Sequence, residues 1–288
     1  MRFSSSRFSS ESDASARAFS LIETLVVVGV LLLLSGIGVL CGRSCIEKAR
    51  SIQEVAGARG TVSAWQAYAN ENNGEVITGY LSMGQASSGS PVRDAAGNPV
   101  TAMNKQRYPY RLANHLNAPL KGTLYVNKQA SLVDTGNQYF ISMAPSFGLN
   151  IALVGGDWGA SFFATPPNAA NIETYGQFAV TRLSQIHAPS RLLVFASARY
   201  REGSQNYEGY NAVLPPNFKE KMWSSAPYNE KQPDDAFGFI HPRYGGRAVC
   251  AMADGHVEML TIDELRDMRR WSNQAAEADD PHWMLRAL

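Results

Sequence analysis

The longest apolar run of the chain lies near its N-terminus. From Thr24 to Cys41 the sequence TLVVVGVLLLLSGIGVLC contains no charged residue. At the α-helical rise of ~1.5 Å per residue this run is about long enough to cross the ~30 Å core of a bilayer. The pattern therefore predicts a transmembrane helix over about residues 21–41. Glu23 stands just before the run, and a lone carboxylate there needs a partner or a function because it is costly in lipid.

A helical pattern continues beyond this run. Apolar residues recur at helical spacing along one side, and Asn72-Asn73-Gly74 supplies a stop signal, so we expect one N-terminal helix over residues 19–72. Gly57 and Gly60 each weaken that helix by about 1 kcal/mol relative to Ala, so packing on a head domain has to hold this part. The residues expected on the packed side are Ile46, Ala49, Ile52, Val55, Val62, Trp65 and Ala69.

The rest of the chain alternates short apolar runs with long irregular stretches. The dipeptide Asp254-Gly255 between two apolar runs, Ala248 to Ala253 and His256 to Leu260, predicts a β-hairpin with a tight two-residue turn. Thr261 and Glu264 have capping-box spacing, which predicts a helix from Ile262 to about Gln274. Further strands are expected at Gln138–Ser142, Phe178–Thr181 and Arg191–Ala196, a short helix at Tyr110–Asn117, an exposed loop at 82–104, and packed decorations or a binding surface at 143–171 and 200–236.

These elements predict an α+β fold. A long N-terminal helix, with a membrane half and an amphipathic half, packs on a head that contains an antiparallel β-sheet. The expected organisation is a leader at 1–18, the N-terminal helix at 19–72, the head domain at 73–260, and a C-terminal helix and tail at 261–288.

Composition excludes several classes of function. The formal net charge is +1, so there is no electrostatic reason to expect nucleic acid as a partner. Three cysteines, Cys41, Cys45 and Cys250, are too few and too badly spaced for a disulfide framework or a CxxC-type metal site.

An enzyme would have to gather His187, His241, His256 and Asp254, perhaps around a metal. No HExxH motif, G-x-S-x-G elbow or phosphate-binding loop is present, and a turn position for Asp254 would break its convergence with His256. The chain is therefore predicted not to be an enzyme and to need no cofactor. A structural calcium ion remains an open alternative, with Asp234-Asp235 as loop carboxylates.

The stretch Ala18-Phe19-Ser20-Leu21-Ile22-Glu23 resembles the leader of type IV prepilins and of the pseudopilins of type II secretion systems. This resemblance implies that a prepilin peptidase cuts between Ala18 and Phe19 and that the new amine of Phe19 is methylated. Ala18 stands where the family usually has Gly. It also implies that Glu23 acts in assembly, by pairing with the Phe19 amine of a neighbouring subunit.

A second resemblance lies in Tyr244-Gly245-Gly246-Arg247 and the following AVCAMADGHV. It is similar to the C-terminal signature of a pseudopilin-like family, in which a His precedes Asp-Gly by ten positions. Here Asp254 and Gly255 match, Tyr244 stands at the position of the His, and His241 lies three residues earlier. Two weaker similarities to the same proteins are a Pro-Ser strand entry at 188–195 and a small-aromatic-Gly-x-Asn turn at 146–150.

The resemblance implies a pilin-like fold and a pseudopilin subunit of a type II secretion or type IV pilus-like filament. Such a subunit would sit in the inner membrane with one span and a periplasmic head before assembly. Its implied partners are the prepilin peptidase, the inner-membrane assembly platform, other pilin-like subunits and membrane lipid. The alternative is a membrane-tethered binding module that never polymerises and holds a carbohydrate or cell-envelope ligand with the loops at 143–171 and 200–236.

Overall fold

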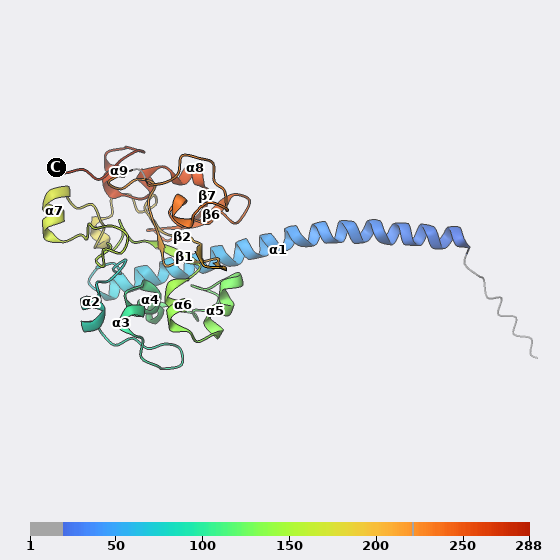
Figure 1. Ribbon diagram of the computed structural model, residues 1–288, viewed down its shortest axis with the longest axis horizontal. Helices are drawn as coiled ribbons and strands as arrows, with labels where there is room; N and C mark the ends of the chain where they lie inside the picture. The colour runs from blue at the N-terminus through green and yellow to red at the C-terminus, as the bar shows by residue number, and fades with distance from the viewer. Residues whose placement is uncertain (1–19, 221) are drawn as a thin grey trace, which may run out of the picture. The chain divides into compact units, whose positions relative to one another are not determined.

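The computed structural model describes residues 20–220 and 222–288, and residues 33–43 by their backbone alone. The chain divides into two compact units, residues 1–47 and residues 48–288, and the second unit is the head. The helices are α1 (Leu21–Glu71), α2 (Met83–Ser88), α3 (Ala102–Lys105), α4 (Tyr108–Leu112), α5 (Ala130–Asp134), α6 (Gln138–Met143), α7 (Ala169–Tyr175), α8 (Ile262–Leu265) and α9 (Asn273–Glu277) (Figure 1). Short 3-10 turns lie at Ala113–His115, Asn127–Gln129, Leu183–Gln185, Asp234–Phe237 and Met268–Arg270.

The prediction of a membrane-crossing helix is wrong. Within residues 20–220 and 222–288, no helix combines the length and the apolar composition needed to cross a bilayer. The single-pass inner-membrane placement with a periplasmic head, and the description as a membrane-anchored secretion pseudopilin, are corrected with it.

The head contains one main sheet of five strands in the order β5-β1-β2-β6-β7. The predicted antiparallel sheet is wrong in one pairing, because β5 runs parallel to β1 with Leu149 opposite Ala212. The other pairings are antiparallel, so the sheet is mixed. Its strands are β1 (Phe147–Asn150), β2 (Leu193–Ser197), β5 (Ala212–Val213), β6 (Arg247–Met252) and β7 (Val257–Thr261).

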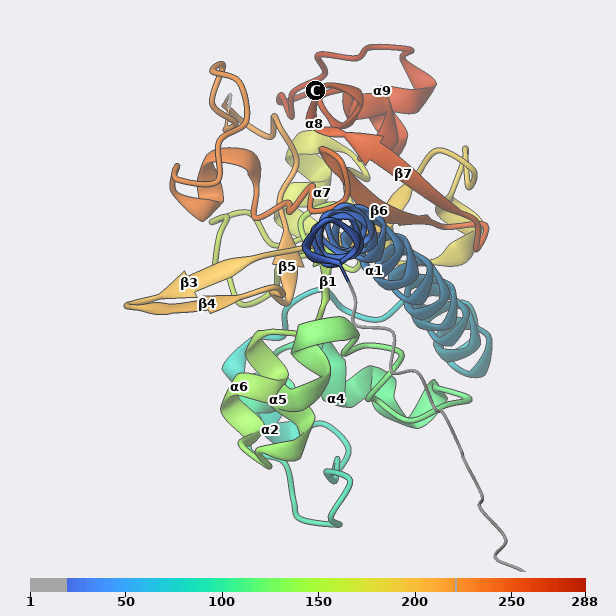
Figure 2. The same cartoon turned by 90° about the vertical axis from the view of Figure 1, so that its right-hand side faces the viewer.

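A separate two-stranded ribbon, β3 (Tyr200–Glu202) and β4 (Gln205–Tyr207), stands out to one side of the main sheet in Figure 2. Its aromatic residues still contact the head. The Tyr200 ring stacks on Tyr210 at 4.7 Å between centroids, and the Tyr207 ring stacks on Phe140 at 5.7 Å. The ribbon is therefore attached through aromatic contacts rather than through the main sheet.

The predicted hairpin is confirmed, with strands β6 and β7 in register from Arg247 opposite Thr261 to Ala251 opposite Val257. Its turn differs from the two-residue type. The Gly255 N–H donates to the Met252 carbonyl at 2.9 Å, and the Met252 N–H donates to His256 O at 2.9 Å. Gly255 alone of the Asp-Gly pair has a positive φ, +95°. This is the pattern of a three-residue loop that ends on a left-handed glycine.

Some of the other local predictions are confirmed and others are wrong. The strand predicted at Arg191–Ala196 is β2, whereas the run at 138–142 is helix α6, with Asn137 as its N-cap. Residues 146–150, expected as a turn, contain strand β1, which lies between β5 and β2, and the 178–181 run contributes one isolated bridge at Val180. The capping box at Thr261 is confirmed, but its helix ends at Leu265 instead of Gln274.

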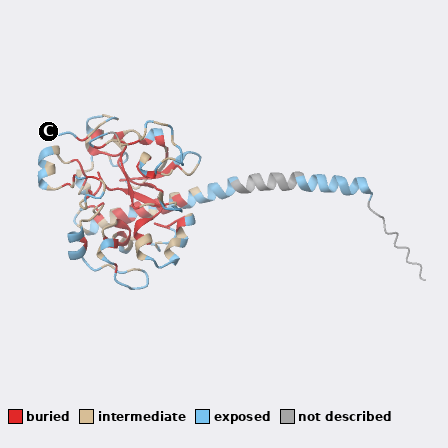
Figure 3. Ribbon diagram, in the orientation of Figure 1, coloured by how far each residue is buried: buried red, intermediate tan, exposed pale blue. Residues whose placement is uncertain are grey.

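Within the head, the second half of α1 lies between the main sheet and the smaller helices α3 to α6 (Figures 1 and 2). Figure 3 shows this half changing from exposed to buried as the helix enters the head. Ala58, Val62, Trp65 and Ala69 are fully buried and follow helical spacing. Ile46 and Ile52, predicted on the same face, are 53% and 69% exposed, so the buried face begins further along the helix.

Gly57 allows the helix to approach its neighbours closely. A Cβ at Gly57 would lie 2.7 Å from both the Thr123 carbonyl oxygen and Val126 Cγ1, and a Cβ at Gly60 would lie 2.8 Å from Thr123 Cγ2. The two glycines that weaken the isolated helix therefore allow α1 to pack closely against residues 123–126.

Candidate functional site

The residue at the centre of the candidate site is Glu54, an acid on the buried face of α1. It is 0% exposed. Tyr244 Oη donates to Glu54 Oε2 at 2.6 Å, and Ser197 Oγ of strand β2 donates to Glu54 Oε1 at 2.6 Å. A buried carboxylate is stable only when its oxygens are paired in this way. Glu54 therefore joins the helix both to the sheet and to the segment before β6.

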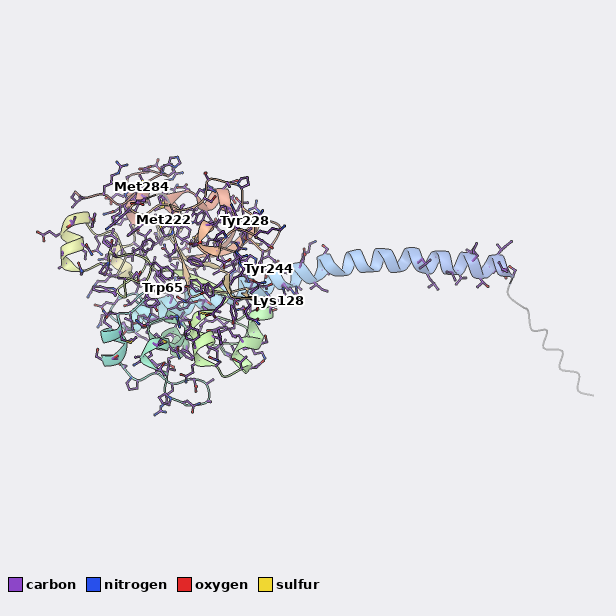
Figure 4. The ribbon with its side chains drawn as sticks, in the orientation of Figure 1. Trp65, Lys128, Met222, Tyr228, Tyr244 and Met284 are labelled. Carbon is purple, nitrogen blue, oxygen red and sulfur yellow. The ribbon has the colours of Figure 1, made fainter. Side chains whose placement is uncertain are left out.

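Two further side chains complete this network. Arg243 Nε lies 3.6 Å from Glu54 Oε1, while its terminal nitrogens donate to the carbonyls of Glu208 at 2.8 Å and Ala198 at 2.7 Å. Asn127 Nδ2 donates to Tyr244 Oη at 2.9 Å. Tyr244 thus accepts one hydrogen bond and donates another. Figure 4 places its side chain beside the segment of α1 that enters the head.

Tyr244 stands where the resembled signature has His, and the environment favours its neutral form. Burial, reinforced by the negative charge of Glu54, raises the pKa of the Tyr244 hydroxyl well above its ordinary value. A phenol held protonated is a donor to Glu54 over the whole physiological pH range. The ordinary pKa of an imidazole, ~6.5, lies much closer to that range than the ordinary pKa of a phenol, ~10.

His241, the nearest histidine to that position, lies outside the network around Glu54. Its Nε2 is 3.7 Å from Glu230 Oε1, and its backbone N–H donates to Ser197 O at 2.9 Å. Burial, together with the charges of Arg243 and Arg199, lowers the pKa of His241 to about 2. His241 is therefore a neutral packing residue and does not replace the family His.

The Asp-Gly end of the signature also contacts α1. Gln66 Nε2 donates to the Ala253 carbonyl at 2.9 Å, and a Cβ at Gly255 would lie 3.4 Å from the same nitrogen. Tyr244 and the turn at 253–255 therefore touch the same helix at Glu54 and at Gln66. The spacing from Tyr244 to Gly255 therefore corresponds to a strand with contacts to α1 at both of its ends.

Asp254 and His256 come together, contrary to the expectation that a turn would separate them. His256 Nδ1 lies 2.6 Å from Asp254 Oδ1 and its Nε2 lies 2.8 Å from Glu258 Oε1. Arg270 Nη1 donates to the second oxygen of Glu258 at 3.2 Å. Partial burial opposes the charged imidazole, but the bonds to Glu258 and Asp254 outweigh it and raise the pKa of His256. The group is a surface chain of alternating charges along the hairpin.

Asp234, half of the calcium alternative, is engaged by arginines. Its carboxylate lies 3.2 Å from Arg199 Nε and 3.0 Å from Arg201 Nε. Two guanidinium groups on one carboxylate disfavour a cation there. Within residues 20–220 and 222–288, no set of three or more His, Cys, Asp or Glu side chains is arranged to hold a metal.

The predicted processing residues Ala18 and Phe19 lie outside the described residues. Glu23 is described, and it caps the start of α1. Its Oε2 accepts the Ser20 N–H at 2.9 Å, and its own N–H donates to Ser20 Oγ at 3.2 Å. This reciprocal pair is a capping box, and its Ser-x-x-Glu spacing is visible in the sequence.

The sequence analysis missed Glu54, Ser197 and Asn127. A sequence signal existed for Glu54, since it lies four residues before Ala58 on the face that carries Val62 and Trp65. Ser197 and Asn127 carry no comparable signal, because 143 and 73 positions separate them from Glu54. No protein-family model, curated protein or solved structure matches this chain.

Proposed function

We propose that this chain is a subunit of a type IV pilus-like filament, in which the first part of α1 is covered by the same part of neighbouring copies. The observation that carries the proposal is the exposure of large aliphatic side chains there, from 84% at Leu21 to 49% at Val28. An apolar surface of this kind marks an interaction site.

The distribution of these side chains favours several partners over one. Leu25, Val26, Val27 and Val28 follow one another at 100° intervals around the helix, so apolar groups point in nearly all directions. A single groove would cover one stripe of such a helix. A bundle of the same helix from several copies covers all sides, and head-to-tail contacts between copies build an open filament.

The buried network around Glu54 supports the same proposal. It fastens α1 to strand β2 and to Tyr244, so the helix and the head move as one piece within residues 48–288. A filament subunit needs this property, because its helix makes the inner contacts while its head forms the outer surface.

Photo-crosslinking in cells that produce the full chain tests the proposal. With p-benzoylphenylalanine at Val28, irradiation is expected to give a ladder of crosslinked copies, with the crosslinked peptide falling in residues 21–32 of another copy. The matched control carries the probe at Ser131, an exposed residue of the head. Monomer alone at Val28, or crosslinks only to other proteins, would overturn the proposal.

The processing that the leader resemblance implies has its own test. Mass spectrometry of the mature chain is expected to find a methylated Phe19 at the N-terminus, produced by a prepilin peptidase. An N-terminus at Met1 would contradict this part of the proposal, and the crosslinking result would stand separately.

A second candidate is a binding module that does not polymerise. The observation in its favour is a cavity of about 400 Å³ in which residues 162–165 meet residues 218–220 and 222. Phe162, Phe163 and Phe218 line it, and they belong to the two loop regions expected to form a binding surface. A crosslinking experiment that yields monomer only would favour this candidate over the filament.

A further inference from the structure

A second, larger cavity lies elsewhere in the head. Its volume is about 460 Å³, and it is lined by the end of α1, by residues 78–92, and by α3, α4 and the 3-10 turn that follows. This volume falls in the range of ordinary small-molecule sites. The cavity belongs wholly to residues 48–288.

Two cationic side chains line this cavity without a counter-ion. Lys105 is 9% exposed, and its Nζ lies 3.5 Å from the Gly89 carbonyl oxygen. Arg111 donates to the backbone carbonyls of Thr78 at 2.7 Å and Lys105 at 2.9 Å. No carboxylate of the described residues forms an ion pair with either side chain.

A cation without an opposite charge is costly to bury because it loses hydration, and here Lys105 is buried and Arg111 is half-buried. Burial lowers the pKa of Arg111 to about 10, so it stays protonated at neutral pH. Among the residues that line the cavity, the one acid is Glu71, and its Oε2 lies 3.1 Å from His115 Nδ1. The interior therefore presents net positive charge toward whatever enters it.

The remaining lining fits a molecule rich in hydroxyl groups. Asn72, Gln85, Ser90 and Asn114 supply amide and hydroxyl groups, which can both donate and accept hydrogen bonds. Tyr68 supplies an aromatic ring, held edge-on to His115 at 5.0 Å between centroids. Flat aromatic surfaces and such polar groups are what a sugar ring contacts.

We propose that this cavity binds a small anionic carbohydrate, a sugar acid or a sugar phosphate, with its negative charge on Lys105 and Arg111. This binding is independent of filament formation, so either proposal can fail alone.

Isothermal titration calorimetry of the full chain tests the proposal, with D-glucuronate, glucose 6-phosphate, D-glucose and inorganic phosphate as probes. One of the two anionic sugars is expected to bind at least about tenfold more tightly than glucose and than inorganic phosphate. The tighter of the two identifies a carboxylate or a phosphate as the preferred anion. Anionic sugars that bind no better than glucose, or no better than inorganic phosphate, would overturn the proposal.

Two variants tie the binding to the cavity. Lys105→Met is expected to weaken binding at least about tenfold, whereas Lys231→Met, at an exposed lysine outside the cavity, leaves it unchanged. Because Lys105 is buried, Ser90→Trp provides a second variant: Ser90 is exposed, and a large side chain there obstructs the cavity. A folded Lys105→Met or Ser90→Trp variant that binds the anionic sugar as tightly as the unsubstituted chain would refute the assignment.

Discussion

Tyr244 Oη lies 2.6 Å from Glu54 Oε2, although 190 positions separate the two residues in the chain. The contact joins the part of α1 that enters the head to the start of the C-terminal hairpin. Since Glu54 is fully buried, the free energy of this contact depends strongly on both partners being present.

Replacing Tyr244 by Phe removes the donor to Glu54 and is expected to lower the free energy of unfolding by about 1–3 kcal/mol. Glu54→Ala is expected to cost about 3–5 kcal/mol, because it also removes the carboxylate nearest to Arg243 and leaves only Glu208, at 4.0 Å. Urea unfolding followed by circular dichroism measures both.

The control is Glu47→Ala, at an exposed acid of the same helix, which should stay within about 0.5 kcal/mol of the unsubstituted chain. The double variant Tyr244→Phe/Glu54→Ala should lose less than the two single losses together. Strict additivity would argue against a direct bond.

Gly57→Ala tests whether close packing outweighs helix propensity. The added methyl gains up to about 1 kcal/mol in propensity but meets Thr123 O and Val126 Cγ1 at 2.7 Å. Overpacking of this kind costs about 1–3 kcal/mol, so a net loss is expected in thermal or urea unfolding.

The matched control for this substitution is Gly84→Ala in α2, where an added Cβ meets no atom within 4 Å. That variant should be neutral or more stable by up to about 1 kcal/mol. If Gly57→Ala behaved like Gly84→Ala, the close approach of α1 to residues 123–126 would be disproved.

His256 should make part of the stability depend on pH. The raised pKa means that the charged imidazole stabilises the folded state fully below its unfolded pKa of ~6.5, and this contribution is lost as pH rises through the folded pKa. His256→Gln should therefore cost up to about 1 kcal/mol at pH 5.5, because the group is partly exposed, and close to nothing at pH 9.

Unfolding curves of His256→Gln at the two pH values check this, with His282→Gln at an exposed histidine as control. The effect also needs ionised acids. Partial burial opposes ionisation of Asp254, but the hydrogen bonds from the backbone N–H and the ring of His256 outweigh it and lower the pKa of Asp254. The contribution of ionised Asp254 to stability therefore persists until the pH falls below the usual Asp range. If His256→Gln lowered the free energy of unfolding equally at pH 5.5 and pH 9, a charged His256 between Asp254 and Glu258 would be excluded.

Glu23 has a cap role in the structure and a proposed pairing role in assembly, and two substitutions separate them. Glu23→Gln can keep the capping box with Ser20 but removes the charge, while Glu23→Ala removes both. If the carboxylate pairs with the Phe19 amine of a neighbour, both variants should lose the Val28 crosslinks. Glu47→Gln should keep them. Crosslinks at the usual yield in Glu23→Gln would leave only the cap role.

The parts of the fold that followed from sequence are those set by local patterns. Strand β2 and the β6–β7 hairpin are apolar runs bounded by turn residues, and Thr261 carries its cap signal three residues before Glu264. The run at 138–142 has strand-forming residues, but Asn137 accepts from the N–H groups of Tyr139 and Phe140 and starts a helix instead.

The remaining features depend on partners that are distant in the chain. Strand β5 has only two residues, inside an irregular stretch, so no periodic pattern in the sequence indicates its parallel pairing with β1. Glu54 is charged and was therefore not counted among core residues, although Ser197 and Tyr244 satisfy it. Arg111 and Lys105 sit in segments without periodicity, so their shared cavity was also not predictable.

The two contacts of the hairpin with α1 also relate the length of β6 to the length of helix between Glu54 and Gln66. Five intervals of extended strand from Arg247 to Met252 cover ~17 Å, and twelve helical intervals from Glu54 to Gln66 cover ~18 Å. The strand thus matches about three turns of helix from end to end. Because β6 is buried on both faces, a single inserted residue would exchange the side chains of the two faces beyond it and leave either Glu54 or Gln66 without its partner.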